Sequence, residues 1–274
     1  MSQKLKIINK IFHFLSSYKK KQILMLWDNY SLSNDSLQNT LHNIYLQINK
    51  KIDPDEHRQD YIIEKLHRVI STYVKPINNS FKIVDIGGGN GNILSGLQHY
   101  LHSSVTKDNF ICIEQPDEWV ETYRFNKHNV SYLFWDNKTM HIESTSVNLI
   151  LIMVSLHHIK DEVIHNILSE CYRILKPGGF IFLKEHNLTS TNKELIEWEH
   201  HLYHIVDLHK QGLPFEFTNY CDKNVFNFKS QEQWISLFTS YQLTQIHRFN
   251  RILETTTESY SKNPTELYWD IFQK

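Results

Sequence analysis

One stretch of the chain has the composition and spacing of a ligand-binding turn. An apolar run at residues 81–86 carries a single acid, and glycines follow it closely. Glycine can take a positive φ and lets a ligand approach the backbone, and a helix that starts after such a turn offers unpaired N–H groups. The spacing is D-x-G-x-G-x-G, formed by Asp85, Gly87, Gly89 and Gly91. A G-x-G-x-x-G dinucleotide pattern fails because Asn92 takes its last position, and the Gly-Lys-Ser/Thr ending of a phosphate loop is missing.

A second acid ends the next predicted strand. Residues 110–114 read Phe-Ile-Cys-Ile-Glu, so Glu114 should lie at the carboxyl end of that strand. An acid at this place can accept hydrogen bonds from both hydroxyls of a ribose. Glu114 lies somewhat farther from the glycine turn than the roughly 20 residues usual in dinucleotide-binding folds. We interpret the polar segment 98–109 as an insertion that accounts for the extra length.

Basic side chains follow two further predicted strands. The strand at 147–154 is followed by Ser155, His157 and His158, and the strand at 180–184 ends in Lys184, followed by Glu185 and His186. The carboxyl ends of parallel strands border the crevice where ligands bind. A histidine near its ordinary pKa can accept a proton at physiological pH. The candidate catalytic residues are therefore His157, His186 and Lys184.

The predicted helix 193–211 is rich in histidine. On a helix, Glu197, His200, His201 and His204 share a face, and three such side chains could hold a zinc ion. The chain contains 17 histidines, so clustering by chance is easy. We interpret these residues as a mixture of surface and packed histidines, with His186, His200 or His201 facing a substrate, and we predict no metal ligands among them.

The elements that must position these residues follow from periodicity. Residues 1–75 contain almost no glycine or proline and predict helices, with an amphipathic face formed by Ile7, Ile8, Ile11, Phe12 and Leu15. From residue 81, strands and helices alternate, which predicts parallel pairing with right-handed crossovers. We predict a helical region over 1–75 and a second domain over 76–274 with a lid-like insertion at about 187–229. The helical region is either a packing extension or a cap over a cleft.

The composition argues against several classes of protein. The 274 residues are 41% apolar with a net charge of −1, so the core is ample and no global basic field indicates nucleic acid. Three widely spaced cysteines predict reduced thiols and a cytoplasmic protein rather than a disulfide scaffold. We expect neither a secretory signal nor a membrane span.

Two further motifs extend the glycine pattern to a family resemblance. His157-His158-Ile159 follows the fourth strand, and Arg173-Ile-Leu-Lys-Pro-Gly-Gly179 leads into the fifth. With the glycine turn, these motifs make residues 81–186 resemble the class I S-adenosylmethionine-dependent methyltransferases. The segment from Asn263 to Trp269 resembles uncharacterised members from bacteria and large DNA viruses. The resemblance implies a seven-stranded, mostly parallel Rossmann-like sheet with an antiparallel last strand.

The resemblance also implies a cofactor, S-adenosylmethionine, and the residues that bind it. By their positions in the motifs, these are Asp85, Gly87, Gly88, Gly89, Asn90, Gly91, Glu114, Gln115, Trp135, Asp136 and Ser155. The glycines should contact the amino-acid portion, Glu114 the ribose, and Trp135 with Asp136 the adenine. In the family an acid often opens the fourth strand, where this chain has Asn148.

The expected activity is methyl transfer to an oxygen or nitrogen atom of an unidentified acceptor. One alternative is RNA methylation at the cap or the ribose 2′-oxygen. That chemistry often uses a Lys-Asp-Lys-Glu set, and here Lys184 fits the fifth strand but Ser155 replaces the aspartate. The other alternative is a non-catalytic scaffold on the same fold. Possible partners are RNA, another protein, or a second copy bound through the N-terminal helices.

Overall fold

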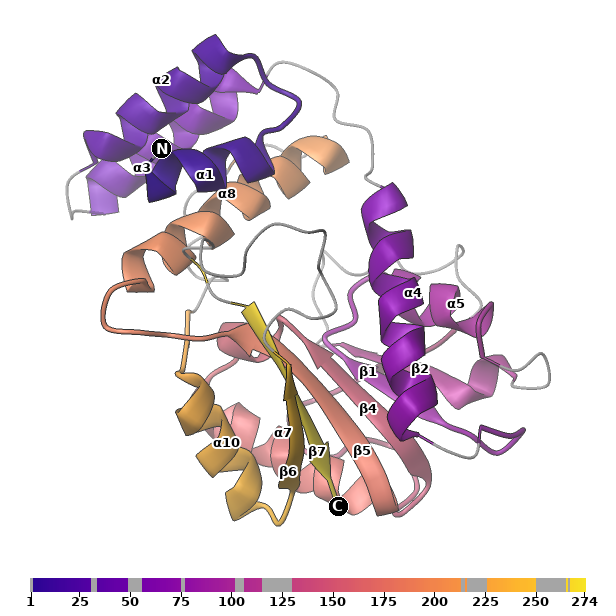
Figure 1. Cartoon of the computed structure of the whole chain (residues 1–274). Helices are drawn as coiled ribbons and strands as arrows, with labels where there is room; N and C mark the ends of the chain where they lie inside the picture. Colours follow the sequence, from indigo (N-terminus) through magenta and orange to yellow (C-terminus); the bar gives the residue numbers. More distant parts are fainter. Residues whose placement is uncertain are drawn as a thin grey trace. The chain divides into compact units, whose positions relative to one another are not determined.

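The computed structural model describes residues 2–30, 34–48, 56–74, 77–101, 106–114, 130–212, 215, 226–249, 265 and 267–274. The chain divides into two compact units, which we call the helical unit and the sheet unit (Figure 1). The helical unit contains Met1–Asp55, Leu188–Phe226 and Ser261–Glu266, and the sheet unit contains the rest. This division differs from the predicted boundary at residue 75. The helix over 56–73 belongs to the sheet unit, and most of the predicted lid-like insertion groups with the first helices.

Within its described residues, the helical unit packs four helices around an aliphatic and aromatic core. They are α1 (Gln3–Ile11), α2 (Ser17–Asp28), α3 (Asn34–Gln47) and α8 (Lys193–Gln211). The five apolar residues predicted to line one face at 7–15 are all buried. Trp27 of α2 stacks on Trp198 of α8 with ring centroids 4.9 Å apart. Long-range packing of amphipathic faces thus joins the chain's start to a segment near residue 200.

The lysine run of α2 has a structural use in this unit. The Lys19 ammonium donates to the carbonyl of Gln47 at the end of α3 (2.6 Å), and the Lys20 ammonium donates to the carbonyl of His13 after α1 (3.5 Å). Cations at helix C-termini satisfy carbonyls that lack an intrahelical partner. These contacts account for two of the three consecutive lysines.

The sheet unit contains a seven-stranded sheet in the order β3-β2-β1-β4-β5-β7-β6. All neighbouring pairs are parallel except that β7 runs antiparallel to both β5 and β6, which confirms the predicted fold class. The strands are β1 (Ile83–Ile86), β2 (Phe110–Glu114), β3 (Ser131–Phe134), β4 (Val147–Met153), β5 (Leu175–His186), β6 (Thr244–Phe249) and β7 (Leu267–Gln273). Central strands buried on both faces need continuous apolar runs, as β4 has.

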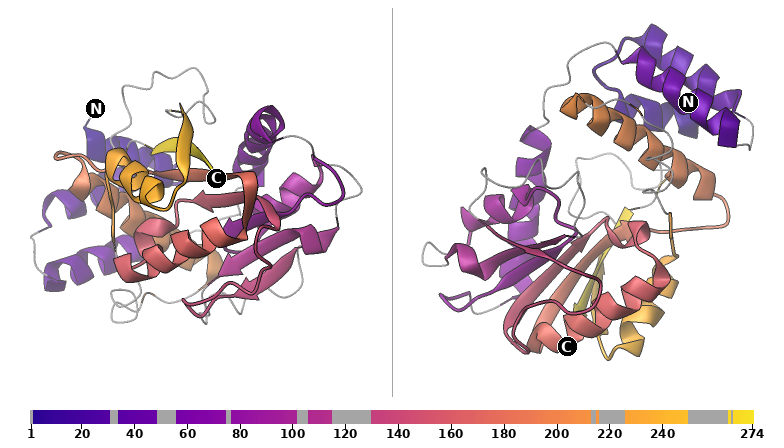
Figure 2. Two further views of the ribbon diagram at one scale, coloured as in Figure 1. Left: turned by 90° about the horizontal axis from the view of Figure 1, so that it is seen from below. Right: turned by 180° about the vertical axis from the view of Figure 1, so that it is seen from behind.

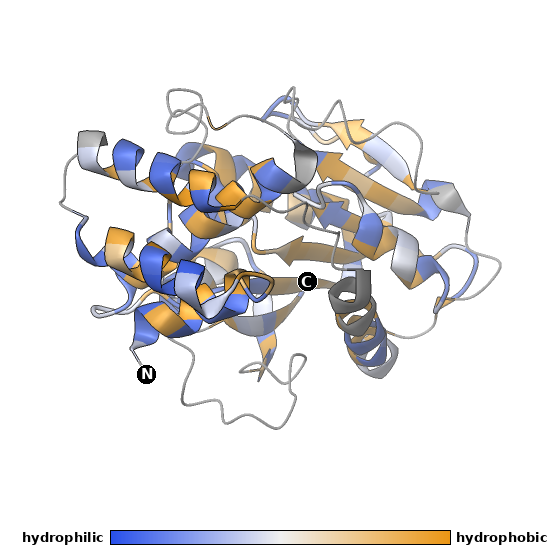
Figure 3. Cartoon of the chain, turned by 90° about the horizontal axis from the view of Figure 1, so that it is seen from above, coloured by the Kyte–Doolittle hydropathy of each residue, from blue (hydrophilic) through white to orange (hydrophobic). Residues whose placement is uncertain are grey.

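Helices cover both faces of this sheet (Figure 2). On one face, α7 (Asp161–Ile174) and α10 (Gln231–Ser240) share a core with the strands, and Phe238 stacks on Phe272 at 4.3 Å. On the other face, α4 (Glu56–Tyr73) and α5 (Asn92–Gln98) pack together. Gly96 permits that contact, because a Cβ there would lie 2.2 Å from Cδ1 of Ile63. The strands appear mostly in the hydrophobic colour of Figure 3.

One predicted turn is part of a strand. The Pro-Gly-Gly sequence within Lys176–Gly179 predicts a tight turn before the fifth strand. In the structure, however, β5 already begins at Leu175. Leu175 pairs with Val147 and Phe180 pairs with Leu149, so the residues between them form a bulge opposite β4. Gly178 supplies the positive φ of 75° that this bulge requires. The other predicted strands agree with the structure to within one or two residues.

Candidate functional site

The glycine loop between β1 and α5 begins in tight contact with the end of β4. Gly87 donates its N–H to the carbonyl of Ile113 (2.9 Å) and has φ of 72°. A Cβ on Gly87 would lie 2.5 Å from Cβ of Ser155. The Ser155 hydroxyl in turn donates to the carbonyl of Ile86 (3.0 Å). Ser155, predicted as a cofactor contact, therefore supports the loop from below, and only glycine fits opposite it.

The middle of the loop is held from two neighbouring strands. The Gly89 N–H donates to the Glu114 carboxylate at the end of β2. The Tyr132 hydroxyl of β3 donates to the carbonyl of Asn90 (2.5 Å) and would lie 2.6 Å from a Cβ on Gly91. By contrast, no atom of the described residues lies within 4 Å of where a Cβ on Gly89 would be. These hydrogen bonds hold the loop in one conformation that leaves the Gly89 backbone uncovered by any described residue.

Asp85 lies buried beneath this loop. Its side chain is 1% exposed, and neither carboxylate oxygen has a hydrogen-bond partner among the described residues. A Cβ on Gly88 would lie 2.7 Å from its Oδ2. Burial, and secondarily the charge of Glu114, raises the pKa of Asp85 well above its usual value. A buried carboxyl without a partner is costly, so this site suits a ligand that brings a hydrogen-bond donor or a cation.

The residues predicted around an adenine are placed differently from one another. The backbone N–H of Trp135 donates to the carbonyl of Glu114 (2.9 Å). The residue is 3% exposed and belongs to the hydrophobic core. Asp136 is exposed and accepts from the N–H of Lys138 (3.0 Å), which lowers the pKa of Asp136. Gln115 lies outside the described residues. The structure therefore buries Trp135 in the hydrophobic core, where it has no exposed face for an adenine, and leaves Asp136 on the surface.

A buried histidine–carboxylate pair lies at the carboxyl ends of β4 and β5. His157 Nδ1 is 2.7 Å from Oε2 of Glu185, and both side chains are at most 1% exposed. The other oxygen of Glu185 accepts from the N–H of Leu156 (2.9 Å). Burial alone would raise the pKa of Glu185, but His157 and these hydrogen bonds lower it overall. An ionised carboxylate only accepts hydrogen bonds, so Nδ1 carries a proton and Nε2 holds the lone pair when the ring is neutral.

The other predicted catalytic residues, Lys184 and His186, are the neighbours of Glu185 in β5. The rings of His157 and His186 are 6.0 Å apart in an edge-to-face arrangement, so the structure brings these two histidines together. Lys184 is 7% exposed, and its ammonium lies 5.3 Å from the ring centroid of Trp269. Because neighbouring residues of a strand point to opposite faces, Lys184 does not share the face of Glu185.

Sequence reasoning assigned no site role to three aromatic residues of this region. Phe228 stacks on His157 with centroids 4.8 Å apart, and Tyr268 lies opposite Glu185 in the β5–β7 pairing. Burial, then the charges of Glu185 and Asp270, raise the pKa of Tyr268 well above its usual value. Tyr132, described above, was also missed. Single aromatic residues in strands and loops carry no local pattern that separates these positions from core ones.

His200 and His201 of α8 have contacts within the helical unit. His200 Nδ1 is 2.9 Å from the carbonyl of Ile196. Burial lowers the pKa of His201 to about 3, so its ring is neutral. That ring contacts the edges of Phe226 and Trp198 at centroid distances of 5.0 and 6.0 Å.

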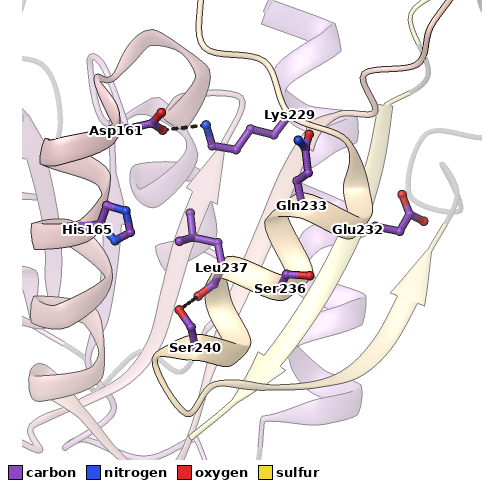
Figure 4. Close-up of a pocket in the computed structure, with 8 residues that line it drawn as sticks. All are labelled: Asp161, His165, Lys229, Glu232, Gln233, Ser236, Leu237 and Ser240. Atoms are coloured by element: carbon purple, nitrogen blue, oxygen red, sulfur yellow. Dashed lines mark hydrogen bonds and ion pairs between the residues drawn. The ribbon is translucent and has the colours of Figure 1, made fainter.

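A groove of about 610 Å³ lies between α7 and α10, apart from the glycine loop (Figure 4). At one end the Lys229 ammonium is 2.7 Å from the Asp161 carboxylate. None of the predicted site residues lines the groove. Its lining consists of Asp161, His165, Lys229, Glu232, Gln233, Ser236, Leu237 and Ser240. Among the described residues, no helix is both long and apolar enough to cross a membrane.

Comparison with known proteins finds one family model that the central region resembles. Residues 83–179 match the family model described as a methyltransferase domain. An S-adenosylmethionine-dependent methyltransferase from Aquifex aeolicus matches with 12% identity and a TM-score of 0.51, over 81% of this chain and 94% of its own. One from Archaeoglobus fulgidus matches with 15% identity and a TM-score of 0.50, over 79% and 94%.

A third structure is the Haloferax volcanii complex of the methyltransferase activator Trm112 with its candidate methyltransferase. It matches with 17% identity and a TM-score of 0.51, over 80% of this chain and 94% of the matched one. No curated protein matches this sequence. At these identities the structural likeness shows the fold.

Proposed function

We propose that this protein transfers the methyl group of S-adenosylmethionine to an oxygen or nitrogen atom of an acceptor, because residues 83–179 match the model of a methyltransferase domain. The cofactor supplies an electrophilic methyl group and its own leaving group when bound. The work left for the chain is to hold the donor, to orient the acceptor and to remove its proton.

The glycine loop and its two acids fit the donor. The Gly89 backbone faces open space, and the unpartnered Asp85 carboxyl beneath the loop suits a cationic or donor group of the ligand. Glu114 already accepts a backbone N–H from Gly89 and stands at the strand end where a ribose is expected. We propose that these three residues hold the cofactor, with Ser155 and Tyr132 keeping the loop in shape.

The observation that carries the proposal of proton removal is the buried pair of His157 and Glu185. His157 lies two positions beyond Ser155, whose side chain lies against Gly87 of the glycine loop. His157 Nε2 would accept the proton of an acceptor hydroxyl or amine, and Glu185 would orient the ring and stabilise the imidazolium. This is the role of a general base held in one tautomer by a carboxylate.

The two alternatives differ in what supports them. RNA ribose methylation would need the lysine at the fifth strand to join an acidic set. Lys184 instead packs over Trp269, and Ser155 binds the carbonyl of Ile86. A scaffold role would leave no reason for an unpartnered buried acid beneath an ordered glycine loop. We therefore favour an enzyme acting on a small molecule or an exposed group.

A transfer assay with labelled S-adenosylmethionine tests the proposal. The protein is mixed separately with a metabolite extract, total RNA and a protein extract, and the transfer of labelled methyl groups into each pool is measured. His157→Gln and Glu185→Gln should lower the transfer rate about 10²–10⁴-fold, the usual contribution of a general base. His165→Gln is the matched control, because that histidine lies exposed on α7 and bonds to Tyr241. Full turnover by His157→Gln would contradict the assigned base, and donor binding without transfer in any pool would favour the scaffold.

We also keep the proposal that the N-terminal helices contact a partner protein or a second copy. Tyr18 and Met25 of α2 are 69% and 62% exposed. They are seven residues apart, so these two large apolar side chains lie on the same face of the helix. Light scattering of the wild-type chain and of a Tyr18→Ser, Met25→Ser variant would detect self-association. A monomer in both samples would argue against a second copy as the occupant.

A further inference from the structure

The segment that leads into α10 is clamped onto the loop that carries His157. The Asn227 N–H donates to the carbonyl of His157 (2.7 Å). Its side-chain amide donates to the carbonyl of Ile159 (3.0 Å) and to the carboxylate of Asp161 (2.8 Å). The Lys229 ammonium closes the set by donating to Asp161 (2.7 Å) and to the Asn227 amide oxygen (2.8 Å). Figure 4 shows the Lys229–Asp161 pair at the end of the α7–α10 groove.

This clamp joins two segments that are about seventy residues apart in sequence. Every hydrogen-bonding group of the Asn227 side chain is used: its amide N–H groups donate to Ile159 and Asp161, shortly after the base candidate, and its oxygen accepts from Lys229. Loops of this kind are usually the mobile parts of a fold. The five hydrogen bonds of the clamp hold this loop in one conformation, and they therefore fix the backbone from which the His157 side chain extends.

The residue between the two clamping side chains is Phe228. Its ring stacks on the His157 imidazole with centroids 4.8 Å apart and planes inclined by 20°, and it meets His186 edge-on at 6.0 Å. A stacked neighbour resists rotation of the imidazole about its Cβ–Cγ bond. Such a rotation would break the 2.7 Å contact of Nδ1 with Glu185 and exchange the positions of the ring atoms.

From these contacts we infer that Asn227 and Phe228 are positioning residues for methyl transfer. They hold the imidazole of His157 in the orientation that leaves Nε2 as the proton acceptor. The inference rests on the proposed function, in which His157 is the base. Preorganisation of this kind contributes to catalysis because a group displaced by about 1 Å loses much of its effect. Neither residue has to touch the acceptor.

Nitrogen NMR of the histidine side chains tests the inference without an identified acceptor. In the wild-type chain, the two-bond proton–nitrogen correlations of His157 should show one tautomer with the proton on Nδ1, and His157→Gln assigns the signals. Asn227→Ala should lose this single pattern and show averaging of both tautomers. Phe228→Leu keeps the hydrogen bonds of the clamp and a buried apolar side chain, so it reports on stacking alone and should also show averaging.

Ser230→Ala is the matched control. Ser230 caps α10 by accepting from the Gln233 N–H (3.2 Å), so its loss should lower Tm without touching His157. The Ser230→Ala spectrum should keep the wild-type pattern of His157. If Asn227→Ala and Phe228→Leu also keep it, the clamp only anchors α10 and the inference is overturned.

Titration of the same samples with S-adenosylmethionine separates this inference from the proposed function. Asn227 and Phe228 lie outside the glycine loop, so both variants should bind the cofactor with wild-type affinity. Absence of binding in the wild-type chain would count against the proposed function, whereas the tautomer of His157 would still decide the role of the clamp. Once an acceptor is found, kcat should fall at least tenfold in both variants while KM for the cofactor stays constant.

Discussion

Replacement of Asp85 by asparagine should make the ligand-free protein more stable at neutral pH. The carboxyl is 1% exposed and has no hydrogen-bond partner among the described residues, and burial raises its pKa well above the usual value. A carboxyl whose pKa is raised in the folded state lowers the stability of the fold once the unfolded chain can ionise it. The stability is complete below the pKa of the unfolded chain, and part of it is lost as pH rises from there to the pKa of the folded chain.

The magnitude follows from this linkage. Over each pH unit in which Asp85 is protonated in the folded chain and ionised in the unfolded chain, the wild type loses about 1.4 kcal/mol of unfolding free energy relative to Asp85→Asn. For a chain of this size, that corresponds to a change in Tm of roughly 2–4 °C per pH unit. The unpaired carboxyl therefore has a stability cost, which is typical of a residue kept for binding.

The assay is urea unfolding of wild type and Asp85→Asn at pH 5, 6 and 7 without ligand. The difference in unfolding free energy should move in favour of the variant as pH rises. Asp136→Asn is the control, because the Lys138 N–H lowers the pKa of Asp136 and its stabilising contribution is lost as pH falls instead. A difference between wild type and Asp85→Asn that does not change with pH would refute the reasoning, since Asp85 would then have to be ionised and paired.

Three further predictions concern the loop and the histidine pair. Gly87→Ala combines a positive φ with a clash against Ser155 and should destabilise the fold by about 2–5 kcal/mol. Gly89→Ala has a φ of 58° but meets no described atom, so it should cost only the backbone strain of about 1–2 kcal/mol and should weaken cofactor binding. Urea unfolding and calorimetry distinguish the two. Tyr132→Phe removes the 2.5 Å bond to the loop carbonyl and should lower cofactor affinity several-fold with little change in Tm; unchanged affinity would mean that the loop keeps its shape without it. Glu185→Gln should show a stability deficit at neutral pH that shrinks as pH falls below about 4.5, because the folded-state pKa of Glu185 is lowered; a deficit independent of pH would mean that its charge does not matter.

Local patterns were enough to predict the frame of the site. The apolar run ending at Ile86, the glycines after it and the acid ending at Glu114 each follow from strand and turn propensities within a few residues. The capping box of Ser230 and Gln233 at the start of α10 is a local feature of the same kind, and both of its hydrogen bonds are present. Such features depend on the chain's immediate neighbours, so the sequence alone determines them.

Features that depend on distant pairings could not be predicted. The amphipathic helix α4 has an apolar face that could have packed on the other N-terminal helices, and only tertiary contacts with α5 decide that it joins the sheet unit. The chemistry of Trp135 allowed a stacking ring as well as a core residue, and the structure buries it in the core. The clamp of Asn227 on the loop after β4 links segments whose proximity no periodicity encodes.

The central claim is that the glycine loop with Asp85 and Glu114 binds S-adenosylmethionine. Calorimetric titration of the purified chain with S-adenosylmethionine and its demethylated product tests it most directly. Micromolar binding to the wild type, abolished by Glu114→Ala and by Gly89→Val but kept by Asp136→Asn, is the predicted result. No binding to either compound, or binding that survives both loop substitutions, would contradict the claim.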